Sequence, residues 1–239
     1  MPGLENTMND LSNQVVLITG AKGGLGTNVT VAFLAAGATV VGSSRAIADA
    51  DFPNSRFAAI PADLTNSDSA HRLTDCLIQR FQRLDALVHV MGGFAGGNSI
   101  PDTDDSTWDK MFSLNLKSAV NILRAVIPHM RRAGRGSIVA IGSRQALEPS
   151  PGLSAYNASK AALASLIRTA ALENKDAGIT ANVILPATMN TEANRKADPA
   201  ANPSKWVQPE QVAALAAFLA SPAAADITGA SIPVFGSEL

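Results

Sequence analysis

Short apolar runs alternate with longer segments of helical character along nearly the whole chain of 239 residues. The apolar runs are rich in Val, Ile and Leu, which predicts strands buried on both faces of a sheet. We expect about seven such strands, at Val15–Thr19, Thr39–Gly42, Arg56–Ile60, Ala86–Met91, Ser137–Ile141, Ala181–Leu185 and Gly229–Phe235. Pro233 cannot donate a ladder hydrogen bond, so the last strand is expected at an edge of the sheet.

The segments between the strands predict helices because their apolar positions recur at helical spacing or because they are rich in Ala and Leu. We expect helices at Leu25–Ala36, Ala70–Arg83, Ser106–Ala133 (bent at Pro128), Ser154–Asp176 and Pro209–Ala220. Strands that alternate with helices require right-handed crossovers and a parallel sheet. The pattern therefore predicts a polar N-terminal extension at 1–13 and one α/β domain at 14–239. That domain is a Rossmann-type, doubly wound parallel sheet with helices on both faces. Residues 187–206 lack clear periodicity, which suits a lid loop over a site.

A glycine-rich turn joins the first strand to the first helix. Gly20 permits a tight turn, Gly24 lets the backbone approach a pyrophosphate, and Gly26 allows close packing of helix on strand. The start of the helix at Leu25 would present free N–H groups to phosphates. The alternative is a glycine-rich surface turn without a ligand.

Tyr156 and Lys160 are four residues apart in a predicted helix, so they share one face. A nearby ammonium favours the phenolate, and we therefore expect Lys160 to lower the pKa of Tyr156 and make it a usable acid or base near neutral pH. Ser143 lies thirteen positions upstream. Taken alone, the pair also fits a solvated helix face.

Together these features resemble the classical short-chain dehydrogenase/reductase family, from about residue 13 to 236. The glycine motif reads T-G-x-x-x-G-x-G from Thr19 to Gly26, and Asn115 stands where that family keeps its fourth catalytic residue. The resemblance implies that Tyr156 exchanges a proton with the substrate oxygen while Ser143 holds that oxygen. It also implies that Lys160 bonds the nicotinamide ribose and that Asn115 holds a water. An asparagine bonded to the backbone inside a helix is an equally open reading of Asn115.

The chain departs from that family after the fourth strand, where His89-Val90-Met91-Gly92 replaces N-N-A-G. We expect His89 to be a packed strand residue. Pro186-Ala187 likewise replaces the usual P-G. The expected cofactor contacts are Gly20, Lys22, Gly24, Leu25, Gly26, Ser44, Arg45, Asp63, Leu64, Gly92, Tyr156, Lys160, Pro186, Thr188, Met189 and Thr191.

The end of the second strand predicts which cofactor is bound. NAD sites place an acid there for the ribose 2′-hydroxyl, whereas NADP sites place Arg there for the 2′-phosphate. Here Ser43-Ser44-Arg45 follows the strand, and Lys22 can add a second charge. We therefore expect NADP(H), with NAD(H) as the alternative. A solvated loop position is the other reading of Arg45.

A narrower resemblance concerns the substrate side. Gly92-Gly93-Phe94-Ala95-Gly96-Gly97 is similar to a segment of quinonoid dihydropteridine reductases, although Ser143 and Arg45 differ from that branch. Phe94 and Trp206 either flank a flat substrate or pack the lid, and Arg144 is a further candidate contact. We expect an oxidoreductase that reduces a carbonyl or quinonoid small molecule. The alternatives are a dihydropteridine reductase-like activity and an NADP-binding regulatory protein without turnover.

Composition narrows the partners. The net charge is −1, so no nucleic-acid footprint is expected, and no apolar run is long enough for a membrane span. Cys76 is the only cysteine, which excludes a disulfide within the chain, and we expect it to be buried in a helix. We predict a cytoplasmic protein without a metal. The two longest predicted helices match the family's dimer interface, which implies a homodimer or homotetramer.

Overall fold

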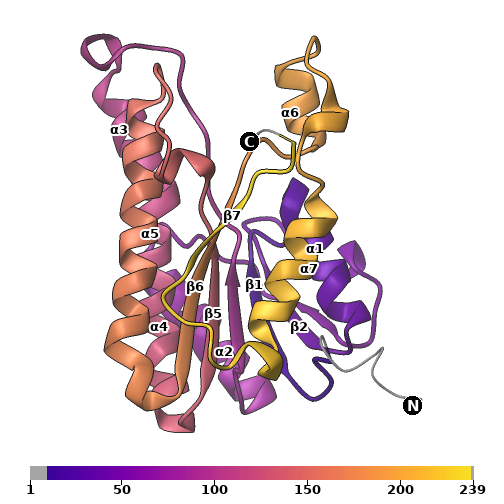
Figure 1. Cartoon of the computed structure of the whole chain (residues 1–239). Coiled ribbons are helices and arrows are strands. Elements are labelled where there is room, and N and C mark those ends of the chain that lie inside the picture. The colour runs from indigo at the N-terminus through magenta and orange to yellow at the C-terminus, as the bar shows by residue number, and fades with distance from the viewer. Residues whose placement is uncertain (1–9, 238–239) are drawn as a thin grey trace.

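Seven parallel strands form one sheet in the computed structural model, which describes residues 10–237 (Figure 1). Their order across the sheet is β3-β2-β1-β4-β5-β6-β7. The strands are β1 Val15–Thr19, β2 Thr39–Ser43, β3 Phe57–Ala59, β4 Ala86–His89, β5 Gly136–Ile141, β6 Ile179–Pro186 and β7 Ser231–Val234. The predicted fold class is confirmed, and β7 with its Pro233 lies at an edge as expected.

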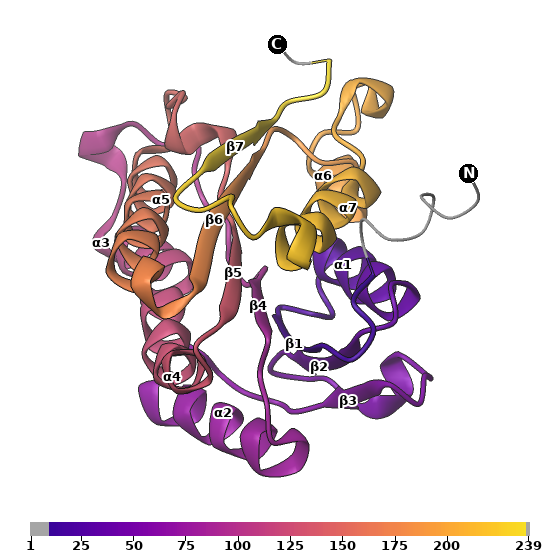
Figure 2. The ribbon, with the colours of Figure 1, turned by 60° about the horizontal axis from the view of Figure 1, so that its bottom comes forward.

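Helices cover both faces of the sheet, as Figures 1 and 2 show. The helices are α1 Gly24–Ala35, α2 Ser67–Phe81, α3 Asp105–Phe112, α4 Ser118–Ala133, α5 Ser154–Asn174, α6 Glu192–Ala197 and α7 Pro209–Ala220. Helices α1 and α7 pack on one face, and α2, α4 and α5 on the other.

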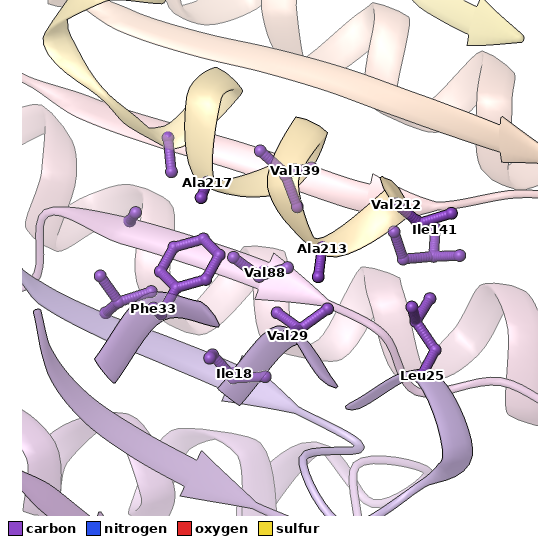
Figure 3. Packing of buried hydrophobic residues seen from close by; sticks show 14 of the residues in the cluster. Ile18, Leu25, Val29, Phe33, Val88, Val139, Ile141, Val212, Ala213 and Ala217 are labelled. Atoms are coloured by element: carbon purple, nitrogen blue, oxygen red, sulfur yellow. The ribbon is translucent and has the colours of Figure 1, made fainter. Parts of the chain in front are cut away.

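The core explains why the strands are apolar without alternation. Along β1, Ile18 belongs to the core shared with α1 and α7, whereas its neighbour Leu17 belongs to the core shared with α2, α4 and α5. Both faces of the strand are thus removed from water. On the first face, Val29 and Phe33 stand one turn apart on α1 and face α7, whose small Ala213 and Ala217 belong to the same core (Figure 3).

The order of the strands reverses between β1 and β4, which both lie at the centre of the sheet. Thr19 at the end of β1 is paired in register with His89 at the end of β4. The loops that follow these two strands diverge to opposite sides, and ligands of open α/β sheets bind in the crevice created there. The fold therefore places the glycine loop at the position where a dinucleotide would bind.

The segment predicted as one long helix at 106–133 contains a π-helical turn at Ser113–Lys117, which separates α3 from α4. Pro128 lies inside α4, which continues to Ala133. The π turn carries the buried Asn115, and such turns are frequent at functional sites.

Three further regions differ from the sequence-based expectations. The lid segment 187–206 contains α6 and a short 3₁₀ turn at Pro203–Lys205, so it is not irregular throughout. Leu11 is buried in the core although it falls within the predicted polar extension, of which residues 1–9 lie outside the described chain. Cys76 is exposed, because the buried stripe of α2 is formed by other positions.

Candidate active site

A cavity of about 1000 Å³ lies at the carboxyl ends of the strands. The glycine loop, the loops that follow β2 to β6, the start of α5 and the lid contribute to its walls. Every residue predicted to contact the cofactor lines this cavity, together with Ser143, Phe94 and Trp206. Segments far apart in the sequence thus meet at one site.

The glycine loop is shaped by contacts that leave no room for side chains. Gly20 has φ +68°, and a Cβ there would lie 2.8 Å from the Met91 nitrogen. A Cβ on Gly26 would lie only 2.0 Å from the Gly20 carbonyl oxygen. Gly24 opens α1, whose first turn has no acidic residue and no side-chain cap. The free N–H groups of this turn form a site suited to an anion.

The end of β2 contributes polar groups to the same cavity. The Ser43 hydroxyl is buried and has no hydrogen-bond partner within residues 10–237. The Ser44 hydroxyl accepts a hydrogen bond from the Lys22 backbone at 3.3 Å. The exposed Arg45 lies near Asp63; hydrogen bonds from Thr65, with a smaller effect from the Arg45 charge, lower the pKa of Asp63.

Lys22 has a partner that its local sequence does not predict. Its ammonium forms an ion pair with Asp51 at 2.7 Å, across to the 3₁₀ turn Asp49–Asp51 that follows β2. Asp49 and Asp51 both stand near the end of β2, and the sequence does not indicate which of them reaches the glycine loop.

Tyr156 and Lys160 occupy successive turns of α5 and both face the cavity, with Ser143 opposite at the end of β5. Lys160 is buried and donates a hydrogen bond to the Ile141 carbonyl at 3.0 Å. Burial lowers the pKa of Lys160 to about 8. Its other two hydrogens remain available to a ligand.

The expected lowering of the Tyr156 pKa by Lys160 is wrong in this structure. Burial raises the pKa of Tyr156 above its ordinary value of 10.0, while a hydrogen bond with Ser143 acts in the opposite direction. The Lys160 nitrogen lies 5.9 Å from the centre of the Tyr156 ring. Because burial also removes the Lys160 charge above about pH 8, no neighbouring cation remains where a phenol titrates.

Asn115 is bonded to the backbone and to a neighbouring helix. Its side-chain oxygen accepts from the Gly93 N–H at 2.7 Å, and its amide nitrogen donates to the Gly93 carbonyl at 3.1 Å and to the Ser159 hydroxyl at 2.9 Å. These bonds engage both amide hydrogens. The side chain therefore fixes the segment Gly92–Gly93 against α5, and its remaining capacity for a hydrogen bond lies on the amide oxygen.

His89 is a packed strand residue, as expected. Its two ring nitrogens lie 2.9 Å from the Thr19 hydroxyl and 3.4 Å from the Ser118 hydroxyl. Burial, with a smaller effect from the Lys160 charge, lowers its pKa to about 3. The ring is therefore neutral and links the ends of β1 and β4 to α4.

The candidate substrate residues separate into two groups. Phe94 is exposed and meets the Tyr156 ring edge to face, with centroids 5.0 Å apart, and Trp206 is buried in the cavity wall. Arg144 does not line the cavity; it pairs with Glu148 at 2.6 Å and lies over the Phe235 ring. Gln145, which the sequence analysis missed, does line it and accepts a hydrogen bond from the Ser143 hydroxyl at 2.5 Å.

Two other classes of site find no support in the part of the chain that the structure describes. Within residues 10–237, no group of three or more His, Cys, Asp or Glu residues could hold a metal ion. In the same range, no helix has both the length and the apolar character needed to cross a membrane.

Comparison with known proteins agrees with this geometry. Residues 14–202 match the short chain dehydrogenase family. The chain is 32% identical to the short-chain dehydrogenase/reductase olcF of Penicillium canescens, over 95% of this chain and 97% of that protein. It is 31% identical to 2,3-dihydro-2,3-dihydroxybenzoate dehydrogenase of Escherichia coli strain K12, over 96% and 98%.

Solved structures extend the comparison to proteins with a bound cofactor. ElxO with NADP bound has a TM-score of 0.88 and 25% identity, and the match covers 94% of this chain and 98% of ElxO. The 3-ketoacyl-(acyl-carrier-protein) reductase of Brucella melitensis complexed with NADH has a TM-score of 0.86 and 27% identity, with 96% and 100% covered.

Proposed function

Because this chain belongs to the short-chain dehydrogenase/reductase family and is thus an oxidoreductase, we propose that it is an NADPH-dependent reductase of a carbonyl or quinonoid small molecule. The observation that carries the proposal is the convergence of Ser143, Tyr156 and Lys160 on the cavity that the glycine loop also lines. A loop suited to bind a dinucleotide and a side chain suited to donate a proton thus line the same cavity.

The residues present fit a dinucleotide. The glycine loop admits no Cβ at Gly20 or Gly26, the first turn of α1 is uncapped, and the buried Ser43 hydroxyl lacks a partner among the described residues. The glycine loop and α1 would hold the pyrophosphate, Asp63 and Leu64 the adenine, and Lys160 the nicotinamide ribose. When bound, the cofactor supplies the hydride.

The preference for NADPH rests on the end of β2. No acid follows the strand directly, and Arg45 with Lys22 places two cations in the wall of the cavity there. A guanidinium is a strong partner for a phosphate and a poor one for a hydroxyl. The similar structures contain NADP in one protein and NADH in another, so this local charge is the argument for NADPH.

Tyr156 is suited to donate a proton. Its pKa lies above 10.0, so the phenol carries its proton at neutral pH and can give it to the substrate oxygen once that oxygen becomes negative and thus more basic. Ser143 stands beside it to bond the same oxygen, and Lys160, charged below about pH 8, favours electron density at the oxygen as it becomes negative. The protein holds the reacting groups together, which removes much of the entropic barrier.

The test is a titration with NADPH and NADH, followed by a panel of ketones, quinones and quinonoid dihydropterin. We expect tighter binding of NADPH and its oxidation by at least one member of the panel. Tyr156→Phe should then lower kcat about a thousandfold and leave the NADPH dissociation constant nearly unchanged. The variant keeps the ring that packs against Phe94, so a loss of activity would reflect the hydroxyl.

The other outcomes of this panel separate the alternatives. Wild-type activity in Tyr156→Phe would exclude Tyr156 as the acid. Oxidation by quinonoid dihydropterin alone, with NADH preferred, would favour the dihydropteridine reductase-like activity, in which Phe94 would cover a flat substrate. Binding of NADPH without turnover would favour the regulatory alternative.

A further inference from the structure

Lys22, one of the two cations proposed to favour NADPH over NADH, forms an ion pair with Asp51. Lys22 belongs to the glycine loop and lines the cavity, whereas Asp51 belongs to the 3₁₀ turn beyond β2. Their side chains are 50% and 24% exposed, so neither is deeply buried. The Lys22 N–H also donates to the Ser44 hydroxyl at 3.3 Å, so the lysine stands beside the Ser44–Arg45 segment of the cavity wall, whereas Asp51 does not itself line the cavity.

Asp51 is held independently of Lys22. Its second carboxylate oxygen accepts the Ala48 N–H at 2.9 Å, and hydrogen bonds from Lys22 and from Ala48 lower its pKa. Asp51 is therefore ionised at neutral pH and stays in place when the lysine moves. The lysine in turn has its charge compensated before any phosphate arrives.

From this arrangement we infer that Asp51 is a specificity-determining residue that limits the preference for NADPH over NADH. A 2′-phosphate would have to share Lys22 with a carboxylate that already neutralises much of the lysine's charge. A 2′-hydroxyl carries no charge, so the same carboxylate affects NADH little. The inference rests on the proposed assignment of the cavity to a dinucleotide.

Asp51→Asn removes the negative charge and keeps the hydrogen bond that shapes the turn. The amide oxygen of Asn can still accept the Ala48 N–H, while the negative charge is lost. We expect the NADPH dissociation constant, measured by fluorescence titration at low ionic strength, to fall roughly three- to tenfold. The NADH dissociation constant should change less than about twofold, because no phosphate meets the altered charge.

Asp49→Asn is the matched control. Asp49 lies in the same 3₁₀ turn and changes the net charge equally, but its carboxylate accepts the Ala59 N–H at 2.7 Å instead of pairing with Lys22. This variant should leave the preference for NADPH nearly as in the wild type. In a Lys22→Met background, Asp51→Asn should likewise lose most of its effect, because its partner is absent.

Several results would overturn the inference. Unchanged or weaker NADPH binding in Asp51→Asn would do so, as would an equal gain in Asp49→Asn or an equal gain for NADH. These results leave the proposed function intact as long as the wild type binds NADPH. A wild type that binds neither dinucleotide would overturn the proposed function and the inference with it.

Discussion

Two regions meet at the cavity and hold their shape by opposite means. The glycine loop, residues 20–26, is shaped by the absence of side chains, and backbone atoms of Gly20 and Met91 occupy the space that a Cβ would need. The buried polar cluster (His89, Asn115, Ser118, Ser159 and Lys160) is shaped by side chains that bond across elements distant in the sequence.

The difference predicts how each region fails. At Gly20 and Gly26 the loop has no side chain that could titrate, so its weakness there is steric: an added methyl group would overlap backbone atoms. In a buried network of polar groups, gaining or losing a proton is costly, because water cannot solvate the ion that forms. The glycine loop should therefore lose stability when a side chain is added, at any pH. The buried polar cluster should lose stability when the pH changes.

The largest effect is expected from a methyl group in the glycine loop. In Gly26→Ala the new Cβ would lie 2.0 Å from the Gly20 carbonyl oxygen, so the backbone must move. We expect a loss of unfolding free energy of about 3 kcal/mol or more, measured by urea denaturation without cofactor. The loss should be similar at pH 7 and at pH 4.

Gly24→Ala is the internal control for that variant. Its Cβ would lie 3.3 Å from the Thr191 side chain, which can adjust, and alanine favours the helix that begins there. Its stability should be near that of the wild type, while its affinity for dinucleotides falls because the backbone must approach the pyrophosphate. Equal stability in Gly24→Ala and Gly26→Ala would show that the close approach of Gly26 to the Gly20 carbonyl does not exclude a side chain.

The same contrast explains how much the sequence predicts. The glycine loop and the pair Tyr156 and Lys160 follow from local spacing, because a turn and one helix face fix their geometry. The sheet follows from the apolar runs, because strands buried on both faces need them. These features, together with the cavity walls formed by the predicted cofactor residues, agree with the structure.

The features that the sequence did not predict depend on contacts between distant segments. The π turn around Asn115 is compensated by bonds to Gly93, and the partner of Lys22 lies 29 positions away at Asp51. Arg144 stands next to a cavity residue, but its side chain turns to Glu148 and Phe235. Spacing along the chain carries no information on such choices.

The second-largest effect is a loss of stability caused by His89, which should appear only at acid pH. Its folded pKa of about 3 lies below the ordinary 6.5, so between these values the unfolded chain binds a proton that the native protein does not. Stability is therefore lost as the pH falls below 6.5, by about 3 kcal/mol at pH 4. His89→Asn should lose that much less unfolding free energy between pH 7 and pH 4, as urea denaturation would show.

His71→Asn is the control for this comparison because His71 is exposed on α2. Comparing each variant with itself at the two pH values removes any constant loss from the broken hydrogen bonds. If His89→Asn lost as much stability in acid as the wild type, the buried polar cluster would not be the pH-sensitive region, and the contrast with the glycine loop would fail.

The smallest effect is a shift in the titration of Tyr156, which is the only tyrosine in the chain. The near-ultraviolet absorbance of phenolate therefore reports this residue without assignment. We expect a midpoint above 10.0, because burial raises the pKa and Lys160 loses its charge near pH 8, before the phenol ionises. Lys160→Met should then leave the midpoint above 10.0. A wild-type midpoint below 10.0 that rises in Lys160→Met would instead show that the ammonium controls the phenol. In that case the pairing predicted from their spacing on the helix would outweigh the burial that the structure shows.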